Sequence, residues 1–431
     1  MSEKIQPKTL KGFYDYFAED MKIRNFLKDL FRETSILYGF EALETPALEY
    51  SELILGQSGE EAEKLYYKFK DNGDRDVMLK YELMIPMCRA VAQNYNNIAF
   101  PYKRYQIQNV WRAENVQKGR LREFTQMDID TLGSSSPIAD AEIIQFGLTF
   151  LKKLGFEKYV VRVNSREIIK GLIDAMEIDQ KYFENIYIGI DKMKKIGEEN
   201  VKAELVEKGI EEKKVSKLIE SLKLDIDSLE SVLKDSEAGM KGLNDVRNIL
   251  EIVRSDKSMA EFAQFDATLT RGLASYTGPV WEYEIIDGGT GSVSGGGRYD
   301  RAVSKYLGKV VPATGTSFGL ERLTEVIKDR GLLKEETSTD NILLIPMDEN
   351  CITYTMEIAD QLRKEDIITN VYPNIQKLKI SLKYADRKNI KWVGIIGENE
   401  MKEKKVLLKN MLEKTQDTLA INEVVNKIIK M

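Results

Sequence analysis

The 431-residue chain contains no histidine and only two cysteines, Cys88 and Cys351. The missing histidines remove the commonest general base and the commonest transition-metal ligand. Two cysteines that lie far apart in the sequence exclude a disulfide framework and a thiolate zinc cluster. Any chemistry must therefore depend on arginines, carboxylates, the backbone and, where a metal is needed, a hard cation.

The sequence also lacks a long apolar run and a strong net charge. No stretch approaches the run of about 18 apolar residues that indicates a membrane span, and the first residues have no apolar signal core. The chain has 64 Lys and Arg against 70 Asp and Glu, a net charge of -6, so its overall charge does not indicate nucleic-acid binding. We expect a cytoplasmic protein without a membrane segment, in which any polyanion site is local.

The pattern of apolar residues predicts several domains. Residues 1–165 and 259–328 combine extended and helical segments, which predicts a discontinuous α+β domain with helices outside an antiparallel sheet. Residues 166–258 are almost wholly amphipathic and predict a helical insertion. Residues 329–340 are polar and predict a linker. Residues 341–431 alternate short apolar runs with helical segments, which predicts a small α/β domain.

Local signals support the first of these domains. Apolar residues at helical spacing predict a helix that ends at Gly39, and Asn72 followed by Gly73 predicts a hairpin turn. Two further extended runs, KRYQIQNVW and FTQMDIDTL, flank a loop between residues 109 and 133. That loop concentrates the charged residues Arg112, Glu114, Lys118, Arg120 and Arg122.

The second of these runs predicts a polar sheet face. Side chains alternate between the faces of a strand, so one face would carry Phe124, Gln126, Asp128 and Asp130. A face with these polar groups is not a core face, and it predicts the floor of a polar pocket under a cationic loop. Such a pocket suits a zwitterion next to a polyphosphate. A solvated edge hairpin with ordinary surface charges explains this stretch equally well.

Two more arginines lie in glycine-punctuated stretches. Arg271, in TLTRGLASYTG, precedes an apolar run, and a guanidinium there needs either water or an anion. Arg322, in GTSFGLERL, lies at a predicted strand-to-helix junction where the neighbouring carboxylate is Glu321. Between them, DGGTGSVSGGGRYD allows a close approach of backbone or ligand, although such a cluster more often forms a turn than a phosphate cradle.

Together these stretches resemble the histidyl-tRNA synthetases, which have the class II aminoacyl-tRNA synthetase fold. WRAE with GRLREFTQ is similar to class II motif 2, and GLERL is similar to motif 3. RGLASYTG and GGGRYD are similar to the two histidine signatures of the family, and ALETPALEYSEL lies where motif 1 belongs. The resemblance covers nearly the whole chain, and it implies a C-terminal anticodon-binding domain and a homodimer formed through motif 1.

The resemblance implies an ATP site with Mg²⁺. Arg112 would hold the α-phosphate, Glu114 would accept from the adenine amine, and Phe124 would stack on the adenine ring. Arg120 and Arg322 would bind the β- and γ-phosphates, with Mg²⁺ neutralising the remaining charge. No side chain was identified as a metal ligand.

The resemblance also implies a histidine site. Glu82 and Gln126 would receive the α-ammonium, and Asp130 with Tyr276 would bind the two imidazole nitrogens. Arg271 would bridge the amino-acid carboxylate and the α-phosphate. The two catalytic residues would then be Arg271 and Arg112. The expected activity is the ATP-dependent formation of histidyl-adenylate and the transfer of histidine to the 3′ end of tRNA(His).

Three residues depart from the family pattern. Ala274 and Ser275 replace an aspartate and a tyrosine of one histidine signature, and Met84 replaces a threonine that helps to bind the ammonium. These departures leave two alternatives: a ligase of altered amino-acid specificity, and a catalytically silent histidine-binding regulatory paralogue. Loss of one hydrogen bond to the imidazole ring would weaken discrimination between amino acids.

A basic segment near the C-terminus is a candidate contact for tRNA. Residues 376–391 contain six basic residues and one acidic residue, Asp386. In a helix, Lys379, Lys383 and Arg387 would form a stripe that could follow phosphates. An ordinary solvated helix face explains the same pattern equally well.

Overall fold

The computed structural model describes residues 5–55, 64–117, 119–271, 275–286, 291–332 and 341–429. Contacts within the chain divide it into two compact units, Met1–Leu332 and Leu333–Met431. Among the helices described, none combines the length and the apolar character that a membrane span requires.

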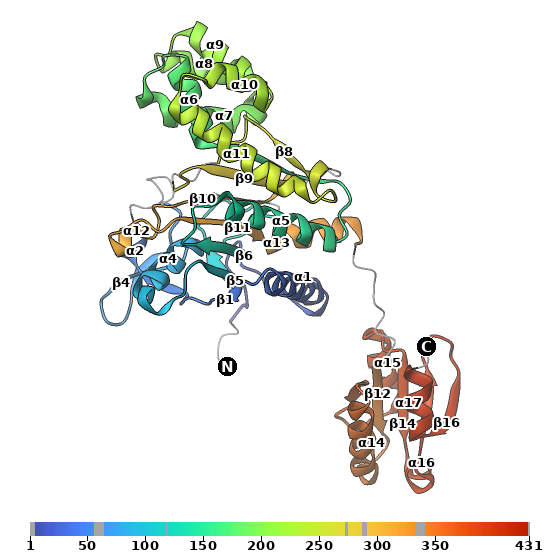
Figure 1. The fold of residues 1–431 in the computed structure, drawn as a ribbon. Coiled ribbons are helices and arrows are strands. Elements are labelled where there is room, and N and C mark those ends of the chain that lie inside the picture. Colours follow the sequence, from blue (N-terminus) through green and yellow to red (C-terminus); the bar gives the residue numbers. More distant parts are fainter. Residues whose placement is uncertain are drawn as a thin grey trace. The chain divides into compact units, whose positions relative to one another are not determined.

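An eight-stranded sheet forms the centre of the first unit, with the order β1-β5-β6-β11-β10-β9-β7-β8 (Figure 1). The strands are β1 Glu41–Ala42, β5 Tyr102–Trp111, β6 Glu123–Leu132, β7 Tyr159–Ser165, β8 Ala263–Phe265, β9 Pro279–Ile285, β10 Gly291–Arg298 and β11 Ala313–Gly319. The predicted antiparallel pairing is confirmed from β5 across to β7. Edge strands β1 and β8 pair in parallel with β5 and β7, and a long connection separates the two strands of each pair, as parallel pairing requires.

Three helices pack beside this sheet, and they are α1 Ala18–Leu37, α5 Pro137–Lys153 and α13 Leu320–Arg330 (Figure 1). The predicted first helix is confirmed, and its chain leaves through Gly39 at a φ of 73°. Phe31, Phe146, Phe150 and Phe318 join α1, α5 and β11 edge to face, with ring centroids 5.2 to 6.2 Å apart. This aromatic core fixes β11 by one face, so the neighbouring Ser317 points to the other.

A smaller sheet lies beside the first, with the order β2-β4-β3. Its strands are β2 Leu48–Tyr50, β3 Lys68–Lys70 and β4 Asp76–Leu79, and helices α2 Ser51–Ile54 and α4 Met84–Gln93 adjoin it. The predicted hairpin is confirmed between β3 and β4. The Oδ1 atom of Asp71 accepts hydrogen bonds from the backbone N–H groups of Gly73 and Arg75, which closes the turn.

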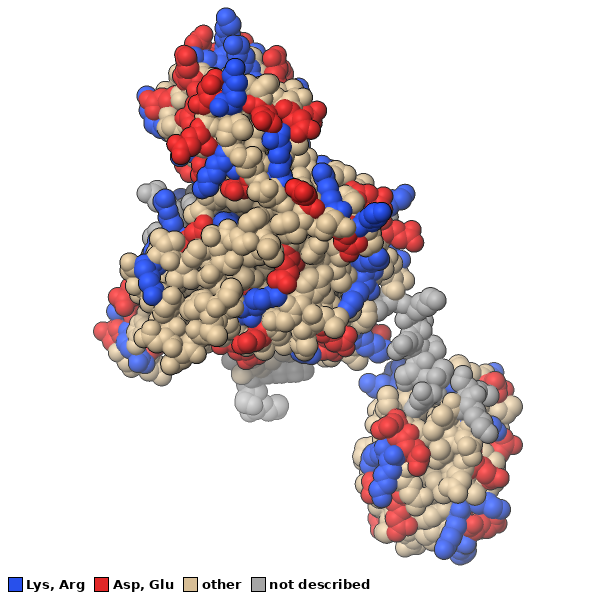
Figure 2. All heavy atoms as spheres, viewed as in Figure 1, with Lys and Arg blue, Asp and Glu red and all other residues tan. Residues whose placement is uncertain are grey.

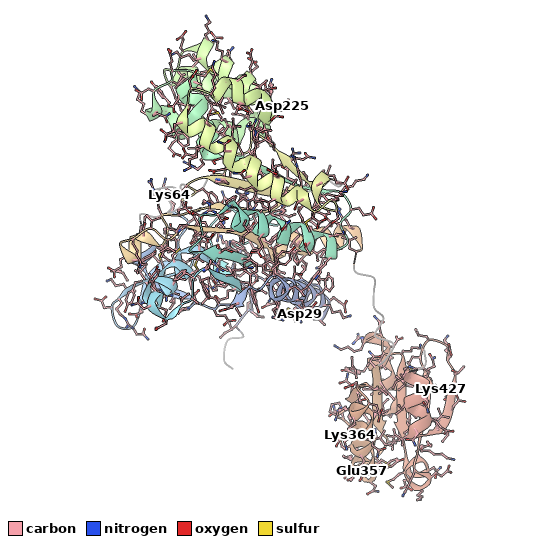
Figure 3. The ribbon with its side chains drawn as sticks, in the orientation of Figure 1. Asp29, Lys64, Asp225, Glu357, Lys364 and Lys427 are labelled. Atoms are coloured by element: carbon pink, nitrogen blue, oxygen red, sulfur yellow. The ribbon has the colours of Figure 1, made fainter. Side chains whose placement is uncertain are left out.

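Residues 166–255 are helical, as their amphipathic pattern predicts. The helices are α6 Arg166–Ala175, α7 Phe183–Ile196, α8 Glu198–Glu207, α9 Glu212–Ser221, α10 Ile226–Leu233 and α11 Glu237–Ser255. Local caps fix their ends: the Oδ1 atom of Asp225, labelled in Figure 3, accepts from the backbone N–H groups of Asp227 and Ser228. α6 and α11 pack so closely that a Cβ on Gly171 would lie 2.3 Å from the Cα of Gly239. The helices belong to the first compact unit, and a separate domain over 166–258 stays a prediction.

The second unit contains a five-stranded sheet with the order β13-β12-β14-β15-β16. Its elements are β12 Asn341–Pro346, α14 Ile352–Lys364, β13 Ile368–Val371, α15 Leu378–Arg387, β14 Trp392–Ile396, α16 Glu398–Glu403, β15 Lys405–Asn410, β16 Gln416–Ala420 and α17 Ile421–Ile429. The predicted α/β alternation is confirmed. Strand β16 was not predicted, because this edge strand is polar and mostly exposed. Asp417 on β16 pairs with Lys427 of α17, which Figure 3 labels.

The predicted linker is shorter at its start than expected. α13 continues through Arg330, and Gly331 ends the helix with a φ of 59°. A glycine at this position is a common helix stop because it has no Cβ to clash in the left-handed region. Residues 333–340 of the predicted linker lie outside the described residues.

Candidate active site

A cavity of about 1100 Å³ lies over β6, β10 and β11. Seven of the residues assigned to a site from the sequence line it, and they are Glu82, Arg112, Phe124, Gln126, Asp130, Arg271 and Tyr276. The other three residues assigned to the ATP site, Glu114, Arg120 and Arg322, are not among its lining residues. The cavity therefore brings together separate segments of the chain around the predicted amino-acid and α-phosphate positions.

Strand β6 forms the polar floor of this cavity. Phe124, Gln126, Asp128 and Asp130 face the cavity, as the alternation predicts, while Met127 and Ile129 are fully buried. The neighbouring strand β5 places a second polar row directly opposite, in which Gln108, Gln106 and Arg104 pair with Gln126, Asp128 and Asp130. The sequence analysis missed this second row, although KRYQIQNVW shows the same alternation of polar residues.

Asp130 is held by two side chains that the sequence analysis did not assign. Arg104 is fully buried, and its Nη2 atom lies 2.7 Å from the Oδ2 atom of Asp130. The phenol of Tyr299 donates a hydrogen bond to the other oxygen of Asp130. Burial raises the pKa of Asp130, and the positive charge of Arg104 opposes that rise. Arg104 and Tyr299 thus fix the orientation of the carboxylate that the sequence assigns to the imidazole ring.

Three buried acceptors of β6 have no hydrogen-bond partner within the described residues, namely Oε1 of Gln126, Oδ1 of Asp128 and Oδ2 of Asp130. The last of these still lies 2.7 Å from Arg104 as an ion pair. The amide nitrogen of Gln126 is already used, since it donates to the hydroxyl of Ser317 over 2.8 Å. A buried acceptor without a donor costs free energy, so these atoms favour a ligand that is rich in N–H groups.

Glu82 precedes helix α4 and acts on its first turn. Its Oε2 and Oε1 atoms accept hydrogen bonds from the backbone N–H groups of Met84 and Ile85, over 3.1 and 2.6 Å. Burial raises the pKa of Glu82, and these backbone donors lower it. The carboxylate is therefore locked in place at the cavity wall, beside the side chain of Met84.

The predicted cationic loop distributes its charges over different places. The Nε atom of Arg112 donates to the backbone oxygen of Tyr81 over 3.1 Å, and its guanidinium lies over the rings of Tyr81 and Phe124. Stacking on two rings holds this cation at the cavity wall. Arg122 turns to the backbone oxygen of Glu114 instead of the cavity. These two arginines of the predicted cationic loop thus have different partners, and Lys118 lies outside the described residues.

The remaining ATP-site candidates lie near one another at the edge of this loop. The Oε1 atom of Glu114 is 4.0 Å from Arg112, and its Oε2 atom is 3.8 Å from the exposed Arg120. Arg322, in the first turn of α13, lies near the same loop, since a Cβ on Gly119 would lie 3.8 Å from its Cδ atom. These positions place Glu114, Arg120 and Arg322 together, beyond the lining of the cavity.

Arg271 has a carboxylate partner. Its Nη1 atom lies 3.1 Å from the Oε1 atom of Glu282 on β9. Its backbone N–H donates to the phenol oxygen of Tyr187 over 3.0 Å. The guanidinium thus lies at the cavity wall with one ion pair, 24% exposed, and its other N–H groups can still bind an anion.

The glycine-rich stretch makes room for two of the site residues. Residues 291–298 form strand β10, so the turn that usually explains such a cluster is wrong for this part, and residues 287–290 lie outside the described residues. A Cβ on Gly295 would lie 1.9 Å from the Nη1 atom of Arg271. On the next strand, a Cβ on Gly315 would lie 1.9 Å from the Oδ1 atom of Asp130. The two glycines leave the space that both side chains occupy.

The helical residues 166–255 also contribute to the cavity. Arg166 and Lys170 of α6 and Phe183 of α7 line it. The guanidinium of Arg166 lies 4.3 Å from the ring centroid of Tyr187 and 4.9 Å from that of Phe183. The sequence analysis did not assign these residues, because nothing local marks a surface helix as one wall of a distant site.

The basic stripe of the second unit lies on a helix, as predicted. Lys379, Lys383 and Arg387 are exposed on α15, and Ser381 and Ala385 are buried on its other side. The three cations are thus available to a ligand, and tRNA as that ligand is a proposal.

Comparisons with known proteins agree with this arrangement. A family model described as histidyl-tRNA synthetase matches residues 12–323, and an anticodon-binding domain model matches residues 341–431. A protein of Clostridium tetani named Histidine--tRNA ligase is 34% identical over 437 residues, covering 99% of this chain and 98% of that protein. The chain belongs to the histidyl-tRNA synthetase family.

Solved structures of the family share the fold. The crystal structure of histidyl-tRNA synthetase from Nostoc sp. PCC 7120 matches this chain with a TM-score of 0.85 and 26% sequence identity. The match covers 99% of this chain and 100% of that chain. A Bacillus halodurans structure, titled as an ATP phosphoribosyltransferase regulatory subunit/histidyl-tRNA synthetase, has a TM-score of 0.74. It is 22% identical, with 88% and 97% of the two chains covered, and at that identity it shows the fold alone. The resemblance found in the sequence motifs is therefore confirmed.

Two of the three residues that depart from the family pattern line the cavity, namely Met84 and Ser275. The third, Ala274, lies outside the described residues. Met84 and Ser275 thus lie in the same cavity as the residues that the sequence predicts to bind histidine.

Proposed function

We propose that this protein is a histidine--tRNA ligase, which activates histidine with ATP and transfers it to tRNA(His). The observation that carries the proposal is the meeting of Glu82, Gln126, Asp130, Arg271 and Tyr276 in one cavity. Membership of the family along the whole chain supports the same activity, since the relative from Clostridium tetani is named for it.

In the proposed amino-acid site, each group of histidine meets a complementary charge or dipole. Arg271 receives the carboxylate, because its guanidinium presents further N–H donors beside the ion pair to Glu282. Glu82 and Gln126 receive the α-ammonium. Asp130, oriented by Arg104 and Tyr299, accepts from one imidazole N–H, and the buried phenol of Tyr276 binds the other nitrogen.

In the proposed ATP site, Arg112 contacts the α-phosphate and Phe124 stacks on adenine. Glu114 accepts from the adenine amine, and Arg120 with Arg322 binds the outer phosphates. Among the described residues no group of three or more His, Cys, Asp or Glu side chains could hold a metal ion. Mg²⁺ usually binds through substrate phosphates with one or two carboxylates, so it would be held here mainly by ATP itself and would neutralise phosphate charge.

The reaction requires positioning and charge stabilisation. A carboxylate oxygen of histidine attacks the α-phosphorus in line while pyrophosphate leaves, and Arg271 holds the two negative groups within reach of each other. The terminal ribose hydroxyl of tRNA then attacks the acyl carbon of the adenylate, loses its proton and forms the ester, while AMP leaves. Adenylate formation needs no side-chain proton carrier, so a protein without histidine can support it.

The proposed partners are tRNA(His) and a second copy of the chain, in the cytoplasm. The anticodon-binding domain model matches the second unit, and the exposed cations of α15 suit the phosphates of tRNA. In Figure 2, uncharged atoms cover much of the visible face of the first unit. Ile36 and Leu37 at the end of α1 and Ile138 on α5 are 60%, 72% and 64% exposed, which supports an apolar interface between two copies.

ATP–pyrophosphate exchange, measured separately with all twenty amino acids, tests the proposed function. We expect exchange with histidine alone. The Arg271→Ala variant should lose roughly a hundredfold or more of the rate, because it removes a cation that acts on developing charge. A matched control is Arg75→Ala, which removes an arginine paired with Asp71 on the exposed hairpin.

Other results of the same measurement would contradict the proposal. The absence of exchange with every amino acid would indicate a regulatory paralogue. Exchange with a different amino acid would indicate altered specificity through Met84, Ala274 and Ser275. Arg112 and Arg271 line one cavity, which favours a ligase over the regulatory paralogue.

A further inference from the structure

The amino-acid cavity contains one more buried carboxylate than the proposed contacts use. Asp128 is 5% exposed and lies on β6 between Gln126 and Asp130, on the same face as both. Its Oδ1 atom has no hydrogen-bond partner within the described residues. A buried carboxylate oxygen in this state costs free energy until a donor reaches it, so Asp128 requires an explanation that the proposed site does not give.

Gln106 of the neighbouring strand does not supply that donor. Gln106 lies directly opposite Asp128 in the sheet. However, its amide nitrogen donates to the hydroxyl of Thr45 over 2.9 Å and to Gln108 over 2.5 Å. The amide nitrogen of Gln106 is therefore occupied by two other acceptors, and the Oδ1 atom of Asp128 keeps no partner.

The α-ammonium of the substrate has more hydrogen-bond donors than the acceptors assigned to it so far. An ammonium group has three N–H donors. At the proposed position, the Oε1 atom of Gln126 is one available acceptor. Glu82 is a second acceptor, although both of its oxygens already accept hydrogen bonds from backbone N–H groups. Met84 lines the same wall and offers only a weak thioether acceptor. A third strong acceptor is thus missing from the set assigned so far.

We propose that Asp128 is a specificity-determining residue of the amino-acid site, and that its free carboxylate oxygen accepts a hydrogen bond from the α-ammonium of the substrate. This inference rests on the proposed function. Residues two apart on one strand face are separated by about 7 Å, so a substrate with its ammonium near Gln126 and its ring at Asp130 passes over Asp128. The ring is already served by Asp130 and Tyr276, and the ammonium is the donor that remains.

The charges around Asp128 favour a cationic ligand. Two buried cations adjoin the floor: Arg104 lies 2.7 Å from Asp130, and Lys80 donates to Gln108 over 2.7 Å. Asp128 and Glu82 add negative charge to the same enclosed space, and burial raises the pKa of Asp128 to about 7. A ligand ammonium would offset this charge and stabilise the ionised carboxylate. A ligand without an α-ammonium would leave the negative charge of Asp128 without a compensating positive charge.

The test compares two ligands with two forms of the protein. Histidine and its analogue without the α-amino group, 3-(imidazol-4-yl)propionate, are measured in ATP–pyrophosphate exchange, histidine by its KM and the analogue by its inhibition constant. In Asp128→Asn, we expect the KM for histidine to rise by about tenfold to a hundredfold, as for the loss of a charge-assisted hydrogen bond. The inhibition constant of the analogue should change by less than about twofold, or improve.

A second variant and a matched control keep the test independent of folding. Asp128→Ser removes the charge in a smaller side chain and should give the same separation between the two ligands. Asp227→Asn changes an exposed carboxylate of α10 that pairs with Arg247, and it should leave both constants at the parental values.

Two outcomes would overturn the assignment of Asp128. One is a parental KM for histidine in both variants. The other is an equal loss for histidine and for the analogue, which would mean that Asp128 acts on the ring or on the shape of the cavity. Either result needs a parental protein that activates histidine. A parental protein without histidine exchange refutes the proposed function instead, so the two failures are distinct.

Discussion

The backbone N–H of Arg271 donates a hydrogen bond of 3.0 Å to the phenol oxygen of Tyr187. Tyr187 is 2% exposed and lies on α7, within the helices that separate β7 from β8. The guanidinium of Arg166 covers its ring. The segment that carries the arginine of the proposed carboxylate clamp is therefore anchored by a helix outside the central sheet, and the two parts of the first unit are mechanically connected at the cavity.

Replacing Tyr187 by phenylalanine should reduce adenylate formation. The ring and its packing remain, but the backbone N–H of Arg271 loses its acceptor, which costs about 1 to 3 kcal/mol when the group stays buried. We expect kcat for ATP–pyrophosphate exchange to fall roughly tenfold, with a smaller change in the KM for histidine. Stopped-flow or exchange kinetics measure both constants.

The control for this prediction is Tyr182→Phe, at the end of the short helix η2 Gln180–Tyr182. It removes a tyrosine hydroxyl from the same helical region and should leave kcat at the parental value. A parental kcat in Tyr187→Phe would show that Arg271 keeps its position without this anchor.

The stability of the unliganded protein should depend on pH through Asp128. Its folded pKa is raised from 3.8 to about 7 because burial outweighs the attraction of Arg104, and Asp130 and Glu82 face the same space. A raised carboxyl pKa gives stability that is present at low pH and is lost as pH rises through the folded pKa. We expect Asp128→Asn to unfold at a higher temperature than the parent at pH 8 and at nearly the same temperature at pH 4.

Thermal unfolding of both proteins at several pH values between 4 and 8 measures this difference. One pKa unit corresponds to about 1.4 kcal/mol, so the gain at pH 8 is a few kcal/mol at most. Asp227→Asn on the exposed surface should follow the parental curve throughout. A gain for Asp128→Asn that is constant across this range would contradict a titrating carboxylate at position 128.

A buried ion pair connects α1 to the strand that carries Phe124. The Nη1 atom of Arg24 lies 2.9 Å from Glu321 of α13, and both side chains bond to Thr125, through its hydroxyl and its backbone N–H. Arg24→Met would leave the Glu321 carboxylate buried and unpaired, which costs about 3 to 5 kcal/mol. We expect this loss in the free energy of unfolding by urea, together with weaker ATP binding through the displaced Phe124.

A double variant and a variant of an exposed ion pair are the controls for Arg24→Met. Arg24→Met combined with Glu321→Gln removes the unpaired charge and should recover part of the stability. Arg32→Met breaks an exposed ion pair of the same helix, with Asp29, which Figure 3 labels, and should cost less than about 1 kcal/mol. Equal losses for Arg24→Met and Arg32→Met would show that the buried pair has no special weight.

Local sequence patterns predicted those residues of the site that lie close together along the chain. The alternation along residues 123–132 placed Gln126 and Asp130 on one face, and the structure confirms that face as a cavity floor. The helices, the hairpin and most strands follow from periodicity in the same way. Patterns of this kind act over a few residues, and they are strongest where one face of an element is buried.

Partners that meet only through tertiary folding left no such pattern. Arg104 on β5 and Tyr299, which follows β10, reach Asp130 from segments distant in sequence, and Tyr187 reaches Arg271 across 84 positions. The parallel edges of the sheet were missed for a related reason, since pairing direction depends on how long connections cross the sheet. The residues that orient the site are therefore the ones that the sequence alone could not name.

The positions of Gly295 and Gly315 have a consequence for how this lineage can change. Neither residue has a side chain to offer a ligand, and yet the volume that each leaves empty is filled by Arg271 or Asp130. Even an alanine would displace the guanidinium or the carboxylate. We therefore expect glycine at both positions in every relative that carries out the reaction. A larger residue at either position would mark a relative in which selection for the reaction has been lost.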